Sequence, residues 1–210
     1  GFRWLWHHPL LKPMAIILGT MNLASMVSGS LLVLYVQEVL RAGPTVFSII
    51  GMGGAVGAVV AGAFASYLSK RLGAGTCLAI TLAGSAALAV VVGLTSSWPV
   101  VFVMTAIESL LGVLWNVITV SLRQSIIPSR LLGRVNSVYR FFAWGMMPLG
   151  AVLGGLVMTS VDSFASRETA LRTVWFVHGG IYAVLFVLGR RLLTTERIEA
   201  ARRSATAVAE

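Results

Sequence analysis

The segment at residues 44–69 reads PTVFSIIGMGGAVGAVVAGAFASYLS and contains no charged residue. A helix rises about 1.5 Å per residue, so about 20 apolar residues cross the roughly 30 Å hydrocarbon core of a bilayer. Gly53 and Gly57 form a GxxxG pair, which lets two helix backbones approach closely inside a membrane. We therefore predict a transmembrane helix that packs tightly against a neighbour.

The composition of the whole chain favours a membrane protein. Of its 210 residues, 57% are hydrophobic and 11% are charged, whereas soluble domains carry about 25% charged residues. A soluble domain of this length has too little interior to bury so much apolar surface. This excludes a secreted enzyme, a disordered chain and a soluble nucleic-acid-binding protein, although the formal net charge is +9. Cys77 is the only cysteine, which excludes an intramolecular disulfide and a cysteine-based metal cluster.

The gaps between charged residues predict an all-α membrane protein with six transmembrane helices. The uncharged run after Arg71 is too long for one helix, and the turn-forming residues 95–99, TSSWP, divide it. The predicted helices span residues 13–36, 44–69, 75–94, 98–122, 137–160 and 171–192. Residues 1–12 are then a cytoplasmic lead-in and residues 193–210 a cytoplasmic tail. Because the chain begins with Gly1 rather than Met, we expect a fragment or a processed piece of a longer protein.

The distribution of Lys and Arg predicts the orientation. Thirteen of them fall on the side of the N-terminus: Arg3, Lys12, Lys70, Arg71, Arg123, Arg130, Arg134, Arg140, Arg190, Arg191, Arg197, Arg202 and Arg203. The opposite side receives only Arg41, Arg167 and Arg172. Because cytoplasmic loops are enriched in basic residues, we expect both termini to be cytoplasmic.

Glu108 is the most informative single residue. It lies ten residues beyond Trp98, roughly 15 Å along the helix axis and therefore near the bilayer midplane. An ionised carboxyl is costly at that depth, so Glu108 should face the protein interior. The residues that share its side of the helix are Thr105, Gly112, Trp115, Asn116 and Thr119. Glu108 either carries a proton or recognises a cation, or it is a neutral carboxyl in a structural hydrogen bond to another helix.

Three further side chains allow two interpretations each. Asn22, near the middle of the first span, either hydrogen-bonds a substrate or links two helices. Arg140 either lies within the membrane or extends its long side chain to the cytoplasmic rim, and the rim is favoured because residues 141–161 span the core without it. Trp144, one turn beyond Arg140, either bounds a cavity or contacts lipid.

The chain contains no sequence motif of a hydrolytic, nucleotide-binding or metal-binding site, and we expect no cofactor and no metal. His7 and His8 are adjacent, but neighbouring histidines without further ligands rarely bind a metal specifically. Helix packing is instead indicated by Gly150 and Gly154 in the fifth span. Pro148 in the same span should kink the helix and free a carbonyl that needs a protein partner or water.

Residues 121–140, SLRQSIIPSRLLGRVNSVYR, resemble the connection between the tenth and eleventh helices of major facilitator superfamily exporters. The following residues 144–155, WGMMPLGAVLGG, are similar to a second-half counterpart of the family's antiporter motif, in which glycines surround a proline. Residues 1–10 resemble the segment that leads from the central loop into the seventh helix. Residues 62–73 resemble a degenerate basic loop between helices two and three, without its usual acidic residue.

The resemblance covers essentially the whole chain. Within the superfamily, the chain most resembles the bacterial branch that contains macrolide efflux proteins and the enterobactin exporter. It implies the C-terminal half of a twelve-helix transporter in the bacterial inner membrane, paired with an N-terminal six-helix half. It also implies proton-coupled efflux of a drug, siderophore or other small molecule by alternating access. Glu108 would lie on the tenth helix and Asn22 on the seventh. The cytoplasmic gating loops would contain Lys70, Arg71, Arg123, Arg134 and Arg140.

Two other functions stay open at the level of sequence. In the first alternative, the chain is a membrane scaffold or a truncated remnant that does not transport. In the second, it is a half-size transporter that acts as a homodimer. In each case the partners are membrane lipid and other helices, and no nucleic acid is expected because the basic residues are spread over separate loops.

Overall fold

A computed structural model describes residues 2–207, and the described residues contain helices and no strand. The elements are α1 (Phe2–His7), α2 (Leu11–Gly29), α3 (Leu32–Leu34), the π-helix η1 (Tyr35–Val39), α4 (Pro44–Leu72), α5 (Ala74–Leu94), α6 (Trp98–Ile126), α7 (Ser129–Asp162), α8 (Arg167–Leu192) and α9 (Thr195–Ala207). Six of the resulting segments are long and apolar enough to cross a membrane, with α2, α3 and η1 forming one of them. The predicted all-α architecture with six apolar helices is confirmed.

Each predicted span lies within one of these six segments, but several helices are longer than the sequence indicated. The largest difference is in α7, which begins at Ser129 instead of residue 137. Pro128 ends the preceding connection, because proline cannot continue a helix but leaves the next residues free to start one. The expected lead-in and tail contain α1 and α9, while Gly1 and residues 208–210 lie outside the described residues.

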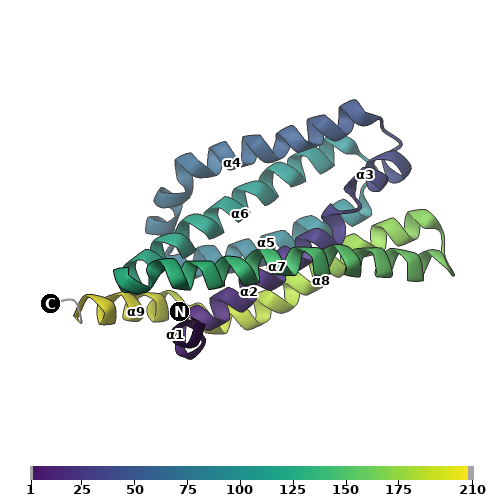
Figure 1. Cartoon of the computed structure of the whole chain (residues 1–210). Coiled ribbons are helices and arrows are strands. Elements are labelled where there is room, and N and C mark those ends of the chain that lie inside the picture. Colours follow the sequence, from purple (N-terminus) through teal and green to yellow (C-terminus); the bar gives the residue numbers. More distant parts are fainter. Residues whose placement is uncertain (1, 208–210) are drawn as a thin grey trace.

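The helices pack mainly in pairs, α4 with α6, α2 with α7 and α5 with α8 (Figure 1). Both described ends of the chain lie at the same end of the bundle, near α1 and α9 (Figure 1). Between α4 and α5 the chain reverses at Gly73, whose φ of 82° is in the left-handed region that favours glycine.

Glycines allow the closest of these helix contacts. A Cβ added at Gly53 would lie 2.7 Å from the carbonyl oxygen of Phe102 in α6. One added at Gly57 would overlap the backbone of Ala106. Gly150 and Gly154 of α7 lie in the same way against the backbone of Leu23 and Val27 in α2. Since lipid supplies no hydrophobic drive between helices, such backbone contact supplies van der Waals attraction that larger residues would prevent.

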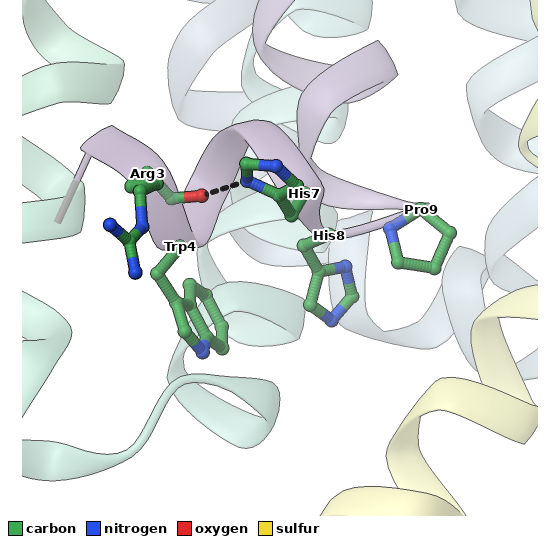
Figure 2. A pocket seen from close by; sticks show the side chains of 5 residues that line it. All are labelled: Arg3, Trp4, His7, His8 and Pro9. Carbon is green, nitrogen blue, oxygen red and sulfur yellow. Dashed lines mark hydrogen bonds between the residues drawn. The ribbon is translucent and has the colours of Figure 1, made fainter.

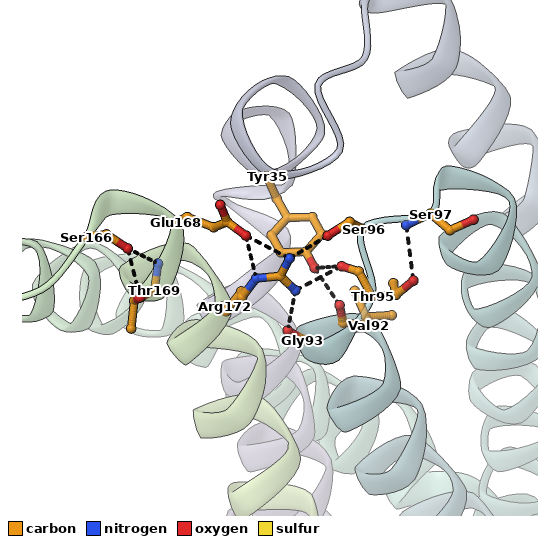
Figure 3. A network of polar contacts seen from close by, with 10 residues as sticks. All are labelled: Tyr35, Val92, Gly93, Thr95, Ser96, Ser97, Ser166, Glu168, Thr169 and Arg172. Atoms are coloured by element: carbon orange, nitrogen blue, oxygen red, sulfur yellow. Dashed lines mark hydrogen bonds and ion pairs between the residues drawn. The ribbon is translucent and has the colours of Figure 1, made fainter.

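At the end of the bundle opposite the termini, Tyr35 and Arg172 tie three elements together (Figure 3). The hydroxyl of Tyr35, from η1, donates to the carbonyls of Val92 and Thr95 at the end of α5. The guanidinium of Arg172, from α8, donates to the carbonyls of Gly93 and Thr95 at 2.8 and 2.9 Å. The carbonyls of Gly93 and Thr95 thus gain side-chain partners at the α5 C-terminus, where the last carbonyls of a helix have no partner within the helix.

The neighbouring glycines 154 and 155 provide a matched test of the α2–α7 contact. We expect Gly154→Ala to lower the free energy of unfolding by about 1–3 kcal/mol, because the new Cβ overlaps the Val27 backbone. Gly155→Ala has open space around its Cβ, so it should leave stability unchanged or raise it slightly through helix propensity. Thermal unfolding in detergent measures both, and equal effects of the two variants would contradict the contact.

Candidate functional site

A cavity of about 150 Å³ lies inside the bundle where α2, α5, α6 and α8 meet. Its walls are formed by Ser25, Ser28, Gly29, Leu32, Leu88, Ala89, Val92, Met104, Thr105, Glu108, Trp175 and His178. Most of these side chains are apolar or small. The polar groups among them are therefore the ones that can recognise a bound species.

Glu108 projects from α6 into this cavity. Its Oε1 accepts a hydrogen bond from Ser85 Oγ of α5 at 3.0 Å. Its Oε2 is buried and has no hydrogen-bond partner among the described residues. One oxygen of the carboxyl thus makes a hydrogen bond to another helix, as expected for a structural role. The other oxygen has no partner, as expected for an acid that carries a proton.

His178 is the second ionisable residue of the cavity, and sequence reasoning missed it. The side chain, from α8, is only 5% exposed. Its Nδ1 shares a hydrogen bond of 2.8 Å with Ser28 Oγ of α2, while its Nε2 is buried without a partner in the described part of the chain. The sequence did contain a signal, since an ionisable residue within a transmembrane segment is a candidate functional group by itself.

Aromatic and hydroxyl side chains surround the imidazole. Trp175 stacks on the ring with centroids 6.0 Å apart, and Tyr182 lies on another side at 5.0 Å. The hydroxyl of Tyr182 shares a hydrogen bond of 3.2 Å with Ser25 Oγ. Four helices therefore contribute to one polar cluster, which consists of Ser25, Ser28, Ser85, Glu108, His178 and Tyr182.

The structure brings only one other predicted site residue to this cavity. Thr105 lines it, and its hydroxyl donates to the carbonyl of Val101 in the same helix. Trp115 is fully buried in the apolar core. Asn116 is exposed, and its amide donates to the Gly112 carbonyl at 3.0 Å.

Asn22 also lies apart from the cavity lining. Its amide donates to the carbonyl of Ala143 in α7 at 2.8 Å. This carbonyl precedes Trp144, whose own carbonyl loses its usual helical partner because Pro148 has no N–H. The contact corresponds to the helix-linking interpretation of Asn22, at the point where α7 is weakest.

The predicted cytoplasmic basic residues lie near the end of the bundle that holds the termini. Arg123 is the most buried, with its guanidinium 4.0 Å from the ring centroid of Tyr139. Arg140 lies 4.8 Å over the ring of Trp144, which is 62% exposed. Lys70, Arg71 and Arg134 are exposed. None of these five residues lines the cavity that holds Glu108.

The adjacent histidines His7 and His8 border an open groove with Arg3, Trp4 and Pro9 (Figure 2). Both are engaged with backbone groups. His7 Nδ1 donates to the Arg3 carbonyl at 2.7 Å, and His8 Nδ1 accepts from the N–H groups of Leu10 and Leu11 at 3.2 and 3.3 Å. His8 therefore caps the start of α2, a structural role for its lone pair.

The cap makes a pH-dependent contribution to stability. Burial lowers the pKa of His8 below its ordinary value of about 6.5. The neutral ring is thus favoured by folding, so its contribution is complete above that ordinary value and is lost as the pH falls through the folded-state pKa.

We expect His8→Ala to lower stability by about 1 kcal/mol at neutral pH, as loss of a helix cap does. In His8→Asn the side-chain oxygen can accept from the N–H two residues ahead and does not titrate, so stability should persist and its dependence on pH should weaken. Thermal unfolding in detergent between about pH 5 and 8 tests this. An unchanged pH dependence in His8→Asn would show that the His8 cap is not its source.

Six helices long and apolar enough to cross a membrane, with ionisable side chains buried among them, are typical of a multi-pass membrane protein with a functional site inside the bundle. Residues 14–209 match the family model of the Major Facilitator Superfamily, and the chain belongs to this superfamily, whose members are transporters and not enzymes. Family membership indicates secondary transport of a small molecule across a membrane. Neither the curated proteins nor the solved structures include a match to this chain.

Proposed function

We propose that the chain is one half of a secondary active transporter that exports a small molecule in exchange for protons. The observation that carries this proposal is the position of Glu108, a carboxyl inside the bundle with one oxygen bonded to Ser85 and the other unpartnered beside a cavity. A buried carboxyl is costly when ionised, so its charge must be lost or compensated as its surroundings change. That property suits an acid that takes up a proton on one side of a membrane and releases it on the other.

A second bundle of six helices is part of the proposal. Asn116 is exposed on α6, at a position where a span in lipid would carry an apolar side chain. Exposed polar groups at this depth favour a face covered by protein or water over one that contacts lipid. A substrate site at the interface of two such halves, opened alternately to either side, fits the family's architecture. Either an N-terminal half or a second copy of this chain would complete it.

The substrate class and location rest on the resemblance of residues 121–155 to bacterial exporters. We propose a drug, a siderophore or another small molecule as the substrate, and the bacterial inner membrane as the location. The concentration of Lys and Arg at the end that holds the termini supports cytoplasmic termini, since basic residues are retained on that side.

Cysteine labelling tests the proposed orientation. With the buried Cys77 replaced by Ser, single cysteines at Ser69 and Arg130 should react with an impermeant thiol reagent only from the cytoplasmic side. Single cysteines at Ser97 and Ser166 should react only from outside, because these residues lie in the connections at the opposite end. Labelling of either pair from the other side would reverse the orientation.

Replacement of Glu108 by Gln tests the proposed coupling. The change keeps the shape and the bond to Ser85 but removes titration, so export driven by a proton gradient should be lost or strongly reduced. Exchange of substrate without a gradient should partly survive. The measurement is export of ethidium, a lipophilic cation, and of erythromycin, a macrolide, against pH in cells with matched membrane abundance of the protein.

The matched control is Glu199→Gln, which removes a carboxyl from α9, away from the cavity. It should export both compounds like wild type. If Glu108→Gln and wild type gave the same pH profile, Glu108 would be structural and the proposed coupling role would fail. If wild type exported neither compound but another membrane protein co-purified with it, the scaffold alternative would be favoured.

A further inference from the structure

Three residues that line the cavity each have a buried polar atom without a hydrogen bond in the described part of the chain: Glu108 Oε2, His178 Nε2 and Trp175 Nε1. The indole N–H of Trp175 can only donate, so Glu108 Oε2 and His178 Nε2 are the two free atoms that can bind a proton. The other polar atoms of Glu108 and His178 are occupied, Oε1 by Ser85 and Nδ1 by Ser28. Buried polar atoms without a partner are rare in folded proteins, and each one calls for a ligand, a water or a functional reason.

The size of the cavity limits what it can hold. A volume of about 150 Å³ is well below the roughly 300–1,000 Å³ of pockets that bind drug-sized ligands. At about 30 Å³ per water molecule it has room for only a few waters. The cavity therefore has room for protons and the waters that carry them.

The two free atoms are complementary when Glu108 is protonated. Ser85 already donates to Oε1, so a proton on the carboxyl belongs on Oε2, which then becomes a donor. If the imidazole is the tautomer that donates its Nδ1 proton to Ser28, Nε2 carries a lone pair and is an acceptor. Water in the cavity can accept from Oε2 and donate to Nε2.

Few other charges act on this pair. Among the residues that line the cavity, Glu108 and His178 are the ones with an acidic or a basic side chain. Tyr182 faces the imidazole from α8, and Tyr35 of η1 reaches it only through Trp175. Arg172, near the start of α8, donates hydrogen bonds to Glu168, Ser96 and the carbonyls of Gly93 and Thr95 (Figure 3). The charge of the cavity is thus set by the carboxyl and the imidazole together.

We propose that His178 is the second proton-binding residue of this transporter and forms one coupled proton site with Glu108. The proton on Oε2 breaks its bond to that oxygen and is passed to water in the cavity, and a proton of that water, or of a water hydrogen-bonded to it, is passed to Nε2. The products are a Glu108 carboxylate and a His178 imidazolium, so the net charge of the cavity does not change. A second proton, taken up by the carboxylate, makes the site cationic. The role of this pair in export rests on the proposed function, whereas its coupling does not.

Reciprocal titration of the two groups tests the coupling. The protein is labelled with ¹⁵N-histidine, and its three histidines are assigned by NMR with His7→Gln, His8→Gln and His178→Gln variants. We expect Glu108→Gln to move the midpoint of the His178 titration by more than about 1 pH unit, as interacting sites require. His178→Gln should move the midpoint of the Glu108 carboxyl, followed by its infrared carbonyl band, by the same amount, because linkage is reciprocal.

The controls separate coupling from a general disturbance of the fold. His7→Gln should leave the Glu108 midpoint in place, and Glu199→Gln should leave that of His178 in place. Midpoints that do not depend on the partner residue would overturn the proposal. If His178→Gln failed to fold, the isosteric Glu108→Gln would decide alone, since an unmoved His178 midpoint there contradicts coupling. Coupled midpoints together with export that ignores the proton gradient would support the paired site and reject the proposed function.

Discussion

Hydrocarbon offers no hydrogen bonds, and this constraint governs nearly every polar group in the structure. Many hydroxyls within the spans bond to their own helix, as Thr20 does to Ile16, Thr159 to Gly155 and Thr119 to Trp115. Three serines instead bond to side chains of other helices: Ser25 to Tyr182, Ser28 to His178 and Ser85 to Glu108. These three bonds converge on one cavity. These serines could have bonded to carbonyls of their own helices, as the threonines do. Because they bond to ionisable and phenolic side chains of other helices instead, this polar cluster is the best indication of function in the bundle.

The same constraint explains which features could be predicted from the sequence. Long uncharged stretches must be helices in lipid, so the six spans follow from the positions of Lys, Arg, Asp and Glu. Glu108 could be singled out because a carboxyl near the midplane is costly wherever it points. The ends of α7 and the helices in the lead-in and tail were less accessible, because helices extend past the bilayer until a residue such as Pro128 stops them.

Residue partnerships could not be predicted in this way. Ser85 precedes Glu108 by 23 residues and Ser28 precedes His178 by 150, so each bond depends on how the helices pack. Asn22 shows the opposite case. It was a reasonable candidate for substrate recognition, yet its amide bonds to Ala143 in α7. A single polar side chain in a span has one hydrogen-bonding need, and only the tertiary structure shows whether a neighbouring helix already meets it.

The glycine contacts and the cavity lie at different helix–helix interfaces, and this separation affects how the helices can move. The glycines join α4 to α6 and α7 to α2 through direct backbone contact, so each pair moves most easily as a unit.

Ser28 of the cavity belongs to the α2–α7 pair and Glu108 to the α4–α6 pair, whereas His178 and Ser85 belong to α8 and α5. Arg172 bonds α8 to the end of α5, which makes those two helices a third unit. Each of the three interhelical bonds made by Ser25, Ser28 and Ser85 therefore crosses between units. A displacement of one pair against α5 and α8 would break or lengthen the bond from Ser28 to His178 or from Ser85 to Glu108. Because these bonds set which oxygen or nitrogen is free, movement of the helices would change the affinity of the proposed site for protons.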